Sequence, residues 1–165
     1  MAQTKLGENI VNTISNLPTT GTVAPAFTLT GNNMKDVSLT EFIGQRVVLN
    51  IFPSIDTGVC STSVREFNKR IASFENAVVL CIARDLPFAM KRFCGAEGID
   101  KAITLSDFRN PNFGKEYGVE LIDGNFRGLL ARAVVVIGAD GKVKYTQLVS
   151  AIGLEPDYDS ALNAL

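Results

Sequence analysis

The sequence predicts an α/β fold in which helices flank a central mixed sheet. Continuous apolar runs alternate with segments of helical periodicity, as in proteins built on parallel strands. The last two apolar runs are joined by an Asp-Gly turn, which adds an antiparallel hairpin and makes the sheet mixed. The chain has 165 residues, a length suited to one compact core. We therefore expect residues 1–165 to form a single domain.

Short elements are expected before residue 46. Residues 2–14 are predicted to form an N-terminal β-hairpin around Gly7, because Gly and Asn supply turn conformations there. The next segments are predicted, in chain order, to be a loop, a short strand, a turn and a helical turn: 17–27, 27–29, 31–36 and 38–46.

The rest of the chain carries the strongest patterns. Three runs rich in β-branched and aliphatic residues are predicted as buried strands: 46–52, 77–83 and 102–107. Apolar residues recur at helical spacing from Val59 to Phe74. Two short helices are expected at 86–98, with Pro87 near its start and a glycine after Cys94, and at 110–118. The closing hairpin (131–138 and 142–149) and a helix at 155–165 complete the fold.

The composition excludes several functional classes. The formal net charge is -1 without a dense Lys/Arg block, which argues against nucleic acid or an anionic membrane as partner. No apolar run approaches the ~18 residues of a membrane span, and no secretory signal pattern is present, so a cytoplasmic protein is expected. The chain has no histidine, which excludes a Ser-His-Asp triad, a Cys-His pair and His-ligated zinc. We expect no metal, flavin or haem.

The turn FPSIDTGVC, residues 52–60, places a cysteine where a helix begins. Pro53 cannot donate to a sheet ladder and ends the preceding strand, and Asp56 or Thr57 can cap a helix that starts near Gly58. Free N–H groups and the positive end of the helix dipole stabilise a thiolate in that first turn. Cys60 is therefore the leading candidate nucleophile, although a small core cysteine would fit the same pattern.

The arrangement P-x-x-x-T-x-x-C, from Pro53 to Cys60, resembles the active-site signature of the peroxiredoxins. Further matching stretches are typical of the thiol peroxidase branch of that family: RFCGAEG (92–98), EYGV (116–119), ARAVVVI (131–137) and EPDY (155–158). The resemblance covers nearly the whole chain. It implies a thioredoxin-like fold and a thiol-dependent peroxidase.

The resemblance also implies a role for each matching residue. Cys60 would attack the peroxide and become a sulfenic acid, Thr57 would contact the peroxide and the sulfur, and Pro53 would shield the site from water. Arg132 would stabilise the thiolate and the charge on the breaking O–O bond. From the residues alone, Arg132 reads more readily as a surface cation at a strand edge, because other arginines are available.

The two other cysteines receive different interpretations. By resemblance, Cys94 is the resolving cysteine, which closes a disulfide with Cys60 that thioredoxin then reduces. The alternative is that Cys94 only packs under its helix. Because the two sulfurs belong to different helices and a disulfide needs Cα atoms within ~7 Å, we expect helix ends to unwind during turnover. Cys81, inside a buried strand, is expected to be an inert core residue.

Some questions stay open at this point. Hydrogen peroxide and organic hydroperoxides are the substrates that the resemblance implies, with homodimers built around the active-site edge. The apolar residues near the motif could line a pocket for an alkyl peroxide, but most of them are expected to serve the core or a dimer contact: Phe52, Ile55, Val59 and Phe88. One alternative is a peroxide sensor that passes its disulfide to a partner protein. Another is a thioredoxin-like binding or chaperone module whose cysteines are vestigial.

Overall fold

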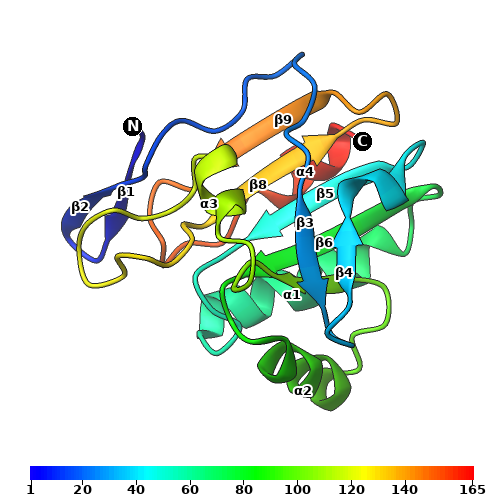
Figure 1. The fold of residues 1–165 in the computed structure, drawn as a ribbon, viewed down its shortest axis with the longest axis horizontal. Helices are drawn as coiled ribbons and strands as arrows, with labels where there is room; N and C mark the ends of the chain where they lie inside the picture. Colours follow the sequence, from blue (N-terminus) through cyan, green and yellow to red (C-terminus); the bar gives the residue numbers. More distant parts are fainter.

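A computed structural model describes residues 1–165, and its centre is a seven-stranded mixed sheet. The strands lie in the order β4-β3-β7-β6-β5-β8-β9 (Figure 1). Their bounds are β3 Thr28–Gly31, β4 Asp36–Ser38, β5 Arg46–Ile51, β6 Ala77–Ala83, β7 Ile103–Ser106, β8 Ala133–Ile137 and β9 Val143–Leu148. β5, β6 and β7 are parallel neighbours, whereas β8, β9, β3 and β4 pair antiparallel. The predicted α/β fold with a mixed sheet is confirmed.

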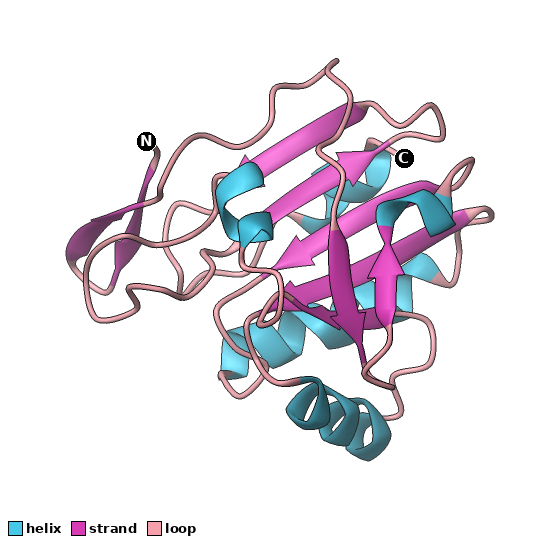
Figure 2. Ribbon diagram, viewed as in Figure 1, coloured by secondary structure: helices cyan, strands magenta, loops and turns pink.

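Helices cover both faces of this sheet (Figure 2). The helical elements are η1 Leu39–Phe42, α1 Gly58–Ile71, α2 Pro87–Glu97, α3 Asn112–Glu116 and α4 Tyr158–Asn163. α1, α2 and α4 pack on one face, and α3 and η1 pack on the other. No helix has the length and hydropathy needed to cross a membrane.

Residues on each central strand alternate between two apolar cores. In β5, Val47 and Leu49 join the core under α3, whereas Val48 faces the core under α1. Because both faces are covered, the central strands read in the sequence as unbroken apolar runs, as predicted.

The N-terminal hairpin forms a separate two-stranded sheet of β1 (Gln3–Leu6) and β2 (Asn9–Asn12), as predicted. The backbone N–H of Lys5 donates to Ser150 O (3.1 Å), and the N–H of Ile152 donates back to Lys5 O (2.8 Å). The Thr4 hydroxyl donates to Val149 O (2.8 Å). The hairpin thus supports the loop that follows β9.

β4 and the end of α1 differ from the sequence-based expectations. β4 was missed, since 31–36 was interpreted as a turn; it has only three residues and depends on pairing with β3. α1 ends at Ile71 and does not reach Phe74. α2, by contrast, has the predicted extent: it ends where Gly98 adopts a left-handed conformation (φ 65°), which glycine accommodates without a Cβ clash.

Candidate active site

Cys60 lies at the carboxyl end of β5, in the first turn of α1. The helix begins after Thr57, whose extended backbone (φ -102°, ψ 146°) is typical of an N-cap, and the N–H of Ser61 donates to Thr57 O (3.0 Å). No side chain caps the free N–H groups of this turn. These donors and the helix dipole favour negative charge at the Cys60 sulfur, which is fully buried.

Arg132 lies directly beside this sulfur. It precedes β8, which runs antiparallel to β5 with Ala133 opposite Ile51, so the arginine arrives at the edge where β5 ends. Its Nη2 donates to Cys60 Sγ (3.3 Å), and its Nε donates to Ile152 O (2.7 Å). The side chain is only 2% exposed, and Nη1 has no hydrogen-bond partner. Arg132 is therefore not the surface cation that the residues alone favoured.

Pro53 and Thr57 flank the sulfur in the connecting turn. Pro53 is buried, and its apolar neighbours Phe52 and Ile55 are buried in the core under α1, as expected. The Thr57 hydroxyl donates to Ser54 O (3.1 Å) and makes no hydrogen bond with the Cys60 sulfur. A contact of Thr57 with a bound peroxide therefore stays a prediction.

Asp85 is a residue of the site that sequence reasoning missed. Its Oδ1 accepts a hydrogen bond from Ser54 Oγ (2.8 Å), and its Oδ2 accepts one from the N–H of Ile55 (2.7 Å). Asp85 follows the carboxyl end of β6, which lies parallel to β5. That position was the available signal, because carboxyl ends of parallel strands meet at one edge of a sheet.

Cys94 lies in the last turn of α2, over a different part of the same face. Its sulfur is 3.7 Å from the Thr104 hydroxyl of β7, and the residue is half-buried. β7 and β8 are separated by β6 and β5, which corresponds to about 14 Å between strand axes. The sulfur partners of Cys60 and Cys94 thus belong to opposite sides of the sheet centre, and all three cysteines are free.

Cys81 is buried in β6, as predicted. The Nδ2 of Asn50 donates to its sulfur (3.6 Å) and also to Ser63 Oγ (3.1 Å). Burial raises the pKa of the Cys81 thiol to about 12. Cys81 is therefore a neutral thiol at physiological pH and a poor nucleophile.

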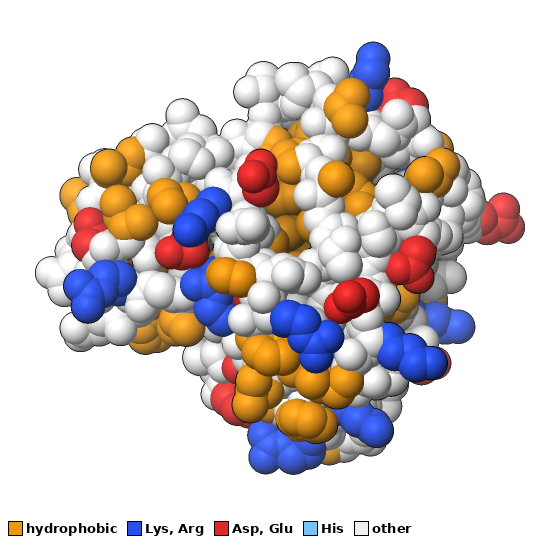
Figure 3. All heavy atoms as spheres, viewed as in Figure 1, with side chains coloured by type: hydrophobic (Ala, Val, Ile, Leu, Met, Phe, Trp, Pro, Cys, Tyr) orange, Lys and Arg blue, Asp and Glu red, His pale blue; other side chains and the backbone are white.

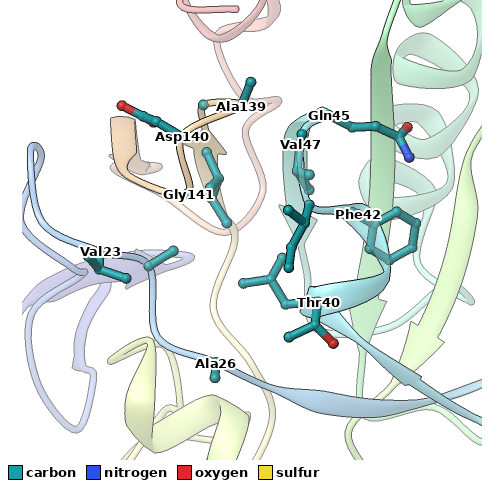
Figure 4. A pocket seen from close by; sticks show the side chains of 15 residues that line it. Val23, Ala26, Thr40, Phe42, Gln45, Val47, Ala139, Asp140 and Gly141 are labelled. Atoms are coloured by element: carbon teal, nitrogen blue, oxygen red, sulfur yellow. The ribbon is translucent and has the colours of Figure 1, made fainter.

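An apolar cavity of about 370 Å³ lies at the opposite end of β5 and β8 (Figure 4). Val47, near the start of β5, and Gly141, in the β8–β9 turn, face it from two sides. Its lining includes none of the three cysteines. The cavity is thus distinct from the sulfur site.

Comparison with known proteins gives the family. The model of the family described as Redoxin matches residues 19–162. Thiol peroxidases of Mycobacterium bovis and Mycobacterium tuberculosis are each 56% identical over 165 residues, covering 100% of this chain and 99% of theirs. The chain belongs to the thiol peroxidase branch of the peroxiredoxin family. This peroxiredoxin is accordingly a peroxidase, an oxidoreductase.

Solved structures agree with this assignment. A peroxiredoxin-like protein from Aquifex aeolicus is 35% identical, with a TM-score of 0.93 and coverage of 99% of this chain and 95% of that one. A thiol peroxidase from Chromobacterium violaceum, at 21% identity and a TM-score of 0.90, has the same fold over 98% of this chain and 93% of its own. The predicted thioredoxin-like fold of this peroxiredoxin is confirmed.

Proposed function

We propose that this peroxiredoxin reduces hydrogen peroxide and organic hydroperoxides through Cys60, and that Cys94 then closes an intramolecular disulfide opened by thioredoxin. The observation that carries the proposal is the 3.3 Å contact between Arg132 Nη2 and Cys60 Sγ, both buried. A permanent cation beside an uncapped helix N-terminus favours an anionic sulfur. That sulfur is the nucleophile required for attack on a peroxide.

In the first step, the Cys60 thiolate attacks one oxygen of ROOH. The S–O bond forms as the O–O bond breaks, the sulfur is oxidised to a sulfenic acid, and the leaving alkoxide takes a proton to become ROH (water when R is hydrogen). Negative charge moves onto the leaving oxygen in this step. The unpartnered, buried Nη1 of Arg132 is available to donate to that oxygen.

Thr57 and Pro53 complete the proposed peroxide site. In this proposal the Thr57 hydroxyl exchanges its bond to Ser54 O for one to the peroxide. Pro53 has no N–H and is buried, so it excludes water without competing for the oxidant.

In the second step, the Cys94 thiol attacks the sulfenic sulfur. The S–S bond forms, the S–O bond breaks, and water leaves with the thiol proton. Since Cys60 contacts Arg132 at β8 and Cys94 contacts Thr104 in β7, the two segments must unwind to bring their Cα atoms within ~7 Å. This route prevents further oxidation to the sulfinic acid.

The remaining parts of the proposal concern assembly and surroundings. Residues 1–165 act as one domain, and two chains associate around the active-site edge as a homodimer. Apolar side chains gather at the end of the molecule that carries α2 (Figure 3), where Leu86 and Phe88 are 53% and 63% exposed. A thioredoxin-reduced disulfide cycle requires a reducing compartment, which we take to be the cytoplasm.

A coupled assay with thioredoxin, thioredoxin reductase and NADPH tests the proposal. We expect sustained, peroxide-dependent NADPH loss for the unmodified chain and none for Cys60→Ser. Cys94→Ser should consume one equivalent of peroxide without sustained NADPH loss and then stall or over-oxidise. Cys81→Ser should retain activity within about twofold, because its thiol is neutral and buried. A single stoichiometric oxidation of the unmodified chain would support the sensor instead, and no oxidation would support a module with vestigial cysteines.

A further inference from the structure

We infer that Asp85 is a positioning residue that clamps the Cys60 turn and sets the balance between peroxide attack and disulfide closure. The inference rests on the proposed function above. Its first support is the pair of hydrogen bonds from Ser54 Oγ (2.8 Å) and the Ile55 N–H (2.7 Å) to the two carboxylate oxygens. Both donors belong to the turn that joins β5 to the Cys60 helix.

Ser54 transmits this restraint to the start of α1. The hydroxyl held by Asp85 also accepts a hydrogen bond from the N–H of Asp56 (3.2 Å). The Ser54 carbonyl oxygen accepts from the Thr57 N–H (3.2 Å) and hydroxyl (3.1 Å). The conformation of the turn before Cys60 therefore depends on Ser54, and the orientation of Ser54 depends on Asp85.

Asp85 is itself fixed to the segment that carries Cys94. It immediately precedes Leu86, the N-cap of α2, and its carbonyl oxygen accepts a hydrogen bond from the buried Ser106 hydroxyl of β7. One residue thus joins the two segments that must separate from the sheet before the sulfurs can meet.

No other contact in this region replaces the clamp. Arg92 of α2 pairs with Asp56 at 3.3 Å, but both side chains are largely exposed, and such pairs contribute little. The neighbouring Arg84 is engaged by Asp107 and Glu120, and Asp85 forms no ion pair of its own. Its carboxylate is therefore available for the two turn donors, whose charge-assisted bonds are stronger than neutral ones.

The clamp should act in opposite directions on the two chemical steps. While it is closed, α1 begins at the position that presents Cys60 to Arg132, which favours attack on peroxide. Disulfide closure requires the turn to open, so the same bonds oppose it. Asp85→Asn removes the charge and presents an amide N–H₂ to one of the donors, which breaks at least one bond.

The two chemical steps, Cys60 oxidation and disulfide closure, can be measured separately. The reduced enzyme is mixed rapidly with one equivalent of hydrogen peroxide, quenched with N-ethylmaleimide and analysed by intact mass. Relative to the reduced enzyme, the sulfenic acid has one free thiol fewer and the disulfide has two fewer. We expect Asp85→Asn to slow the first step about tenfold, the effect of losing one such bond, and to accelerate the second severalfold. Ser54→Ala should change both rates in the same directions by less, because the Ile55 bond remains.

Asp123→Asn is a matched control, because Asp123 accepts from the N–H (2.8 Å) and Nδ2 (2.7 Å) of Asn12, far from either sulfur in the chain. Both its rates should stay within twofold of the unmodified enzyme. The inference is overturned if Asp85→Asn and Ser54→Ala leave both rates unchanged, or slow both steps together. Absence of sulfenic acid in the unmodified enzyme would instead refute the proposed function.

Discussion

At the scale of one residue, Arg132 is a buried positive charge without an acidic partner. Moving a guanidinium out of water costs several kcal/mol unless a counter-charge and hydrogen bonds replace the lost hydration. None of the ion pairs includes Arg132, and its protein partners are the Cys60 sulfur and a backbone carbonyl. A Cys60 thiolate would supply the missing negative charge. The proposed chemistry and the stability of the buried arginine are thus mutually dependent.

Substituting Arg132 tests this dependence at the scale of one residue. Arg132→Met should lower the rate constant of Cys60 oxidation by about 10²–10³, the usual cost of losing a charge-stabilising donor. Arg132→Lys should fall between, because a lysine keeps the charge but lacks the planar fork that reaches both Cys60 and Ile152. Competition with catalase for hydrogen peroxide measures this rate.

Arg127→Met serves as the control, since Arg127 is exposed, and it should react like the unmodified enzyme. Circular dichroism checks that each variant is folded. An Arg132→Met enzyme with an unchanged oxidation rate would remove Arg132 from the mechanism.

Local residue patterns located part of the site and could not locate the rest. Cys60 is found from its neighbours, because Pro53 and Thr57 mark a strand end and a helix start within eight positions. Arg132 contacts a sulfur 72 positions away, and Asp85 binds donors 30 and 31 positions upstream. Local patterns do not specify such distant contacts, so the burial of Arg132 was misjudged. Asp85 was missed because its only signal is its position after the carboxyl end of β6, which shows that it lies near the turn but not which donors it binds.

At the scale of elements, the last turn of α2 holds Cys94 in the helix. The N–H groups of Gly98 and Ile99 both donate to Cys94 O, which closes the helix through the left-handed Gly98. Gly95 lies inside the helix, and a Cβ added there would meet no other atom within 4 Å. Substituting Gly95 should therefore stabilise the end of this helix, and substituting Gly98 should destabilise it.

Gly98→Ala and Gly95→Ala should shift disulfide closure in opposite directions. The first forces alanine into a positive φ and should destabilise the turn by about 1 kcal/mol, whereas the second should stabilise the helix by about 0.5–1 kcal/mol. If unwinding accompanies closure, Gly98→Ala accelerates the loss of the second thiol and Gly95→Ala slows it. Equal closure rates in the two variants would contradict unwinding of α2.

The bounds of the longer elements could be predicted from the sequence, whereas the shortest strand could not. β5, β6 and α1 were expected within three residues of their bounds because apolar residues dominate their patterns. β4 has three residues, and Asp36, Val37 and Ser38 form a strand only because β3 lies beside them.

At the scale of the whole molecule, two buried acidic groups, the Cys81 thiol and the Tyr117 phenol, make the free energy of unfolding decrease at alkaline pH. Burial raises the pKa of Cys81 from the ordinary 9.0 to about 12, and it also raises the pKa of Tyr117. At a pH between the ordinary pKa of such a group and its raised pKa in the folded protein, the folded state keeps a proton that the unfolded state releases. The free energy of unfolding must therefore fall as the pH rises above about 9.

Urea unfolding followed by circular dichroism at pH 7 and pH 10.5, under reducing conditions, measures this effect. Each fully protected group can contribute up to ~1.4 kcal/mol per pH unit, so a loss of a few kcal/mol is expected. Tyr117→Phe also loses the hydrogen bond to Pro25 O (2.7 Å) and should be less stable at pH 7, but its stability should decline less steeply above pH 10. Equal unfolding free energies of the unmodified protein at both pH values would contradict the prediction.

The fold class followed from the sequence, but the arrangement of the strands did not. Alternating strands and helices suffice to predict a covered mixed sheet. The placement of β3 and β4 beside β7 joins strands that are far apart in the chain, and no local pattern specifies that pairing.

The sheet confines the sulfur chemistry to one side of the molecule. Cys60, Cys81 and the helix of Cys94 belong to the face covered by α1 and α2, whereas the core under α3 contains no cysteine. The chain also lacks tryptophan. An indole introduced across the sheet, for example by Phe42→Trp beside the apolar cavity, would therefore give a fluorescent reporter of folding on the face that carries no cysteine.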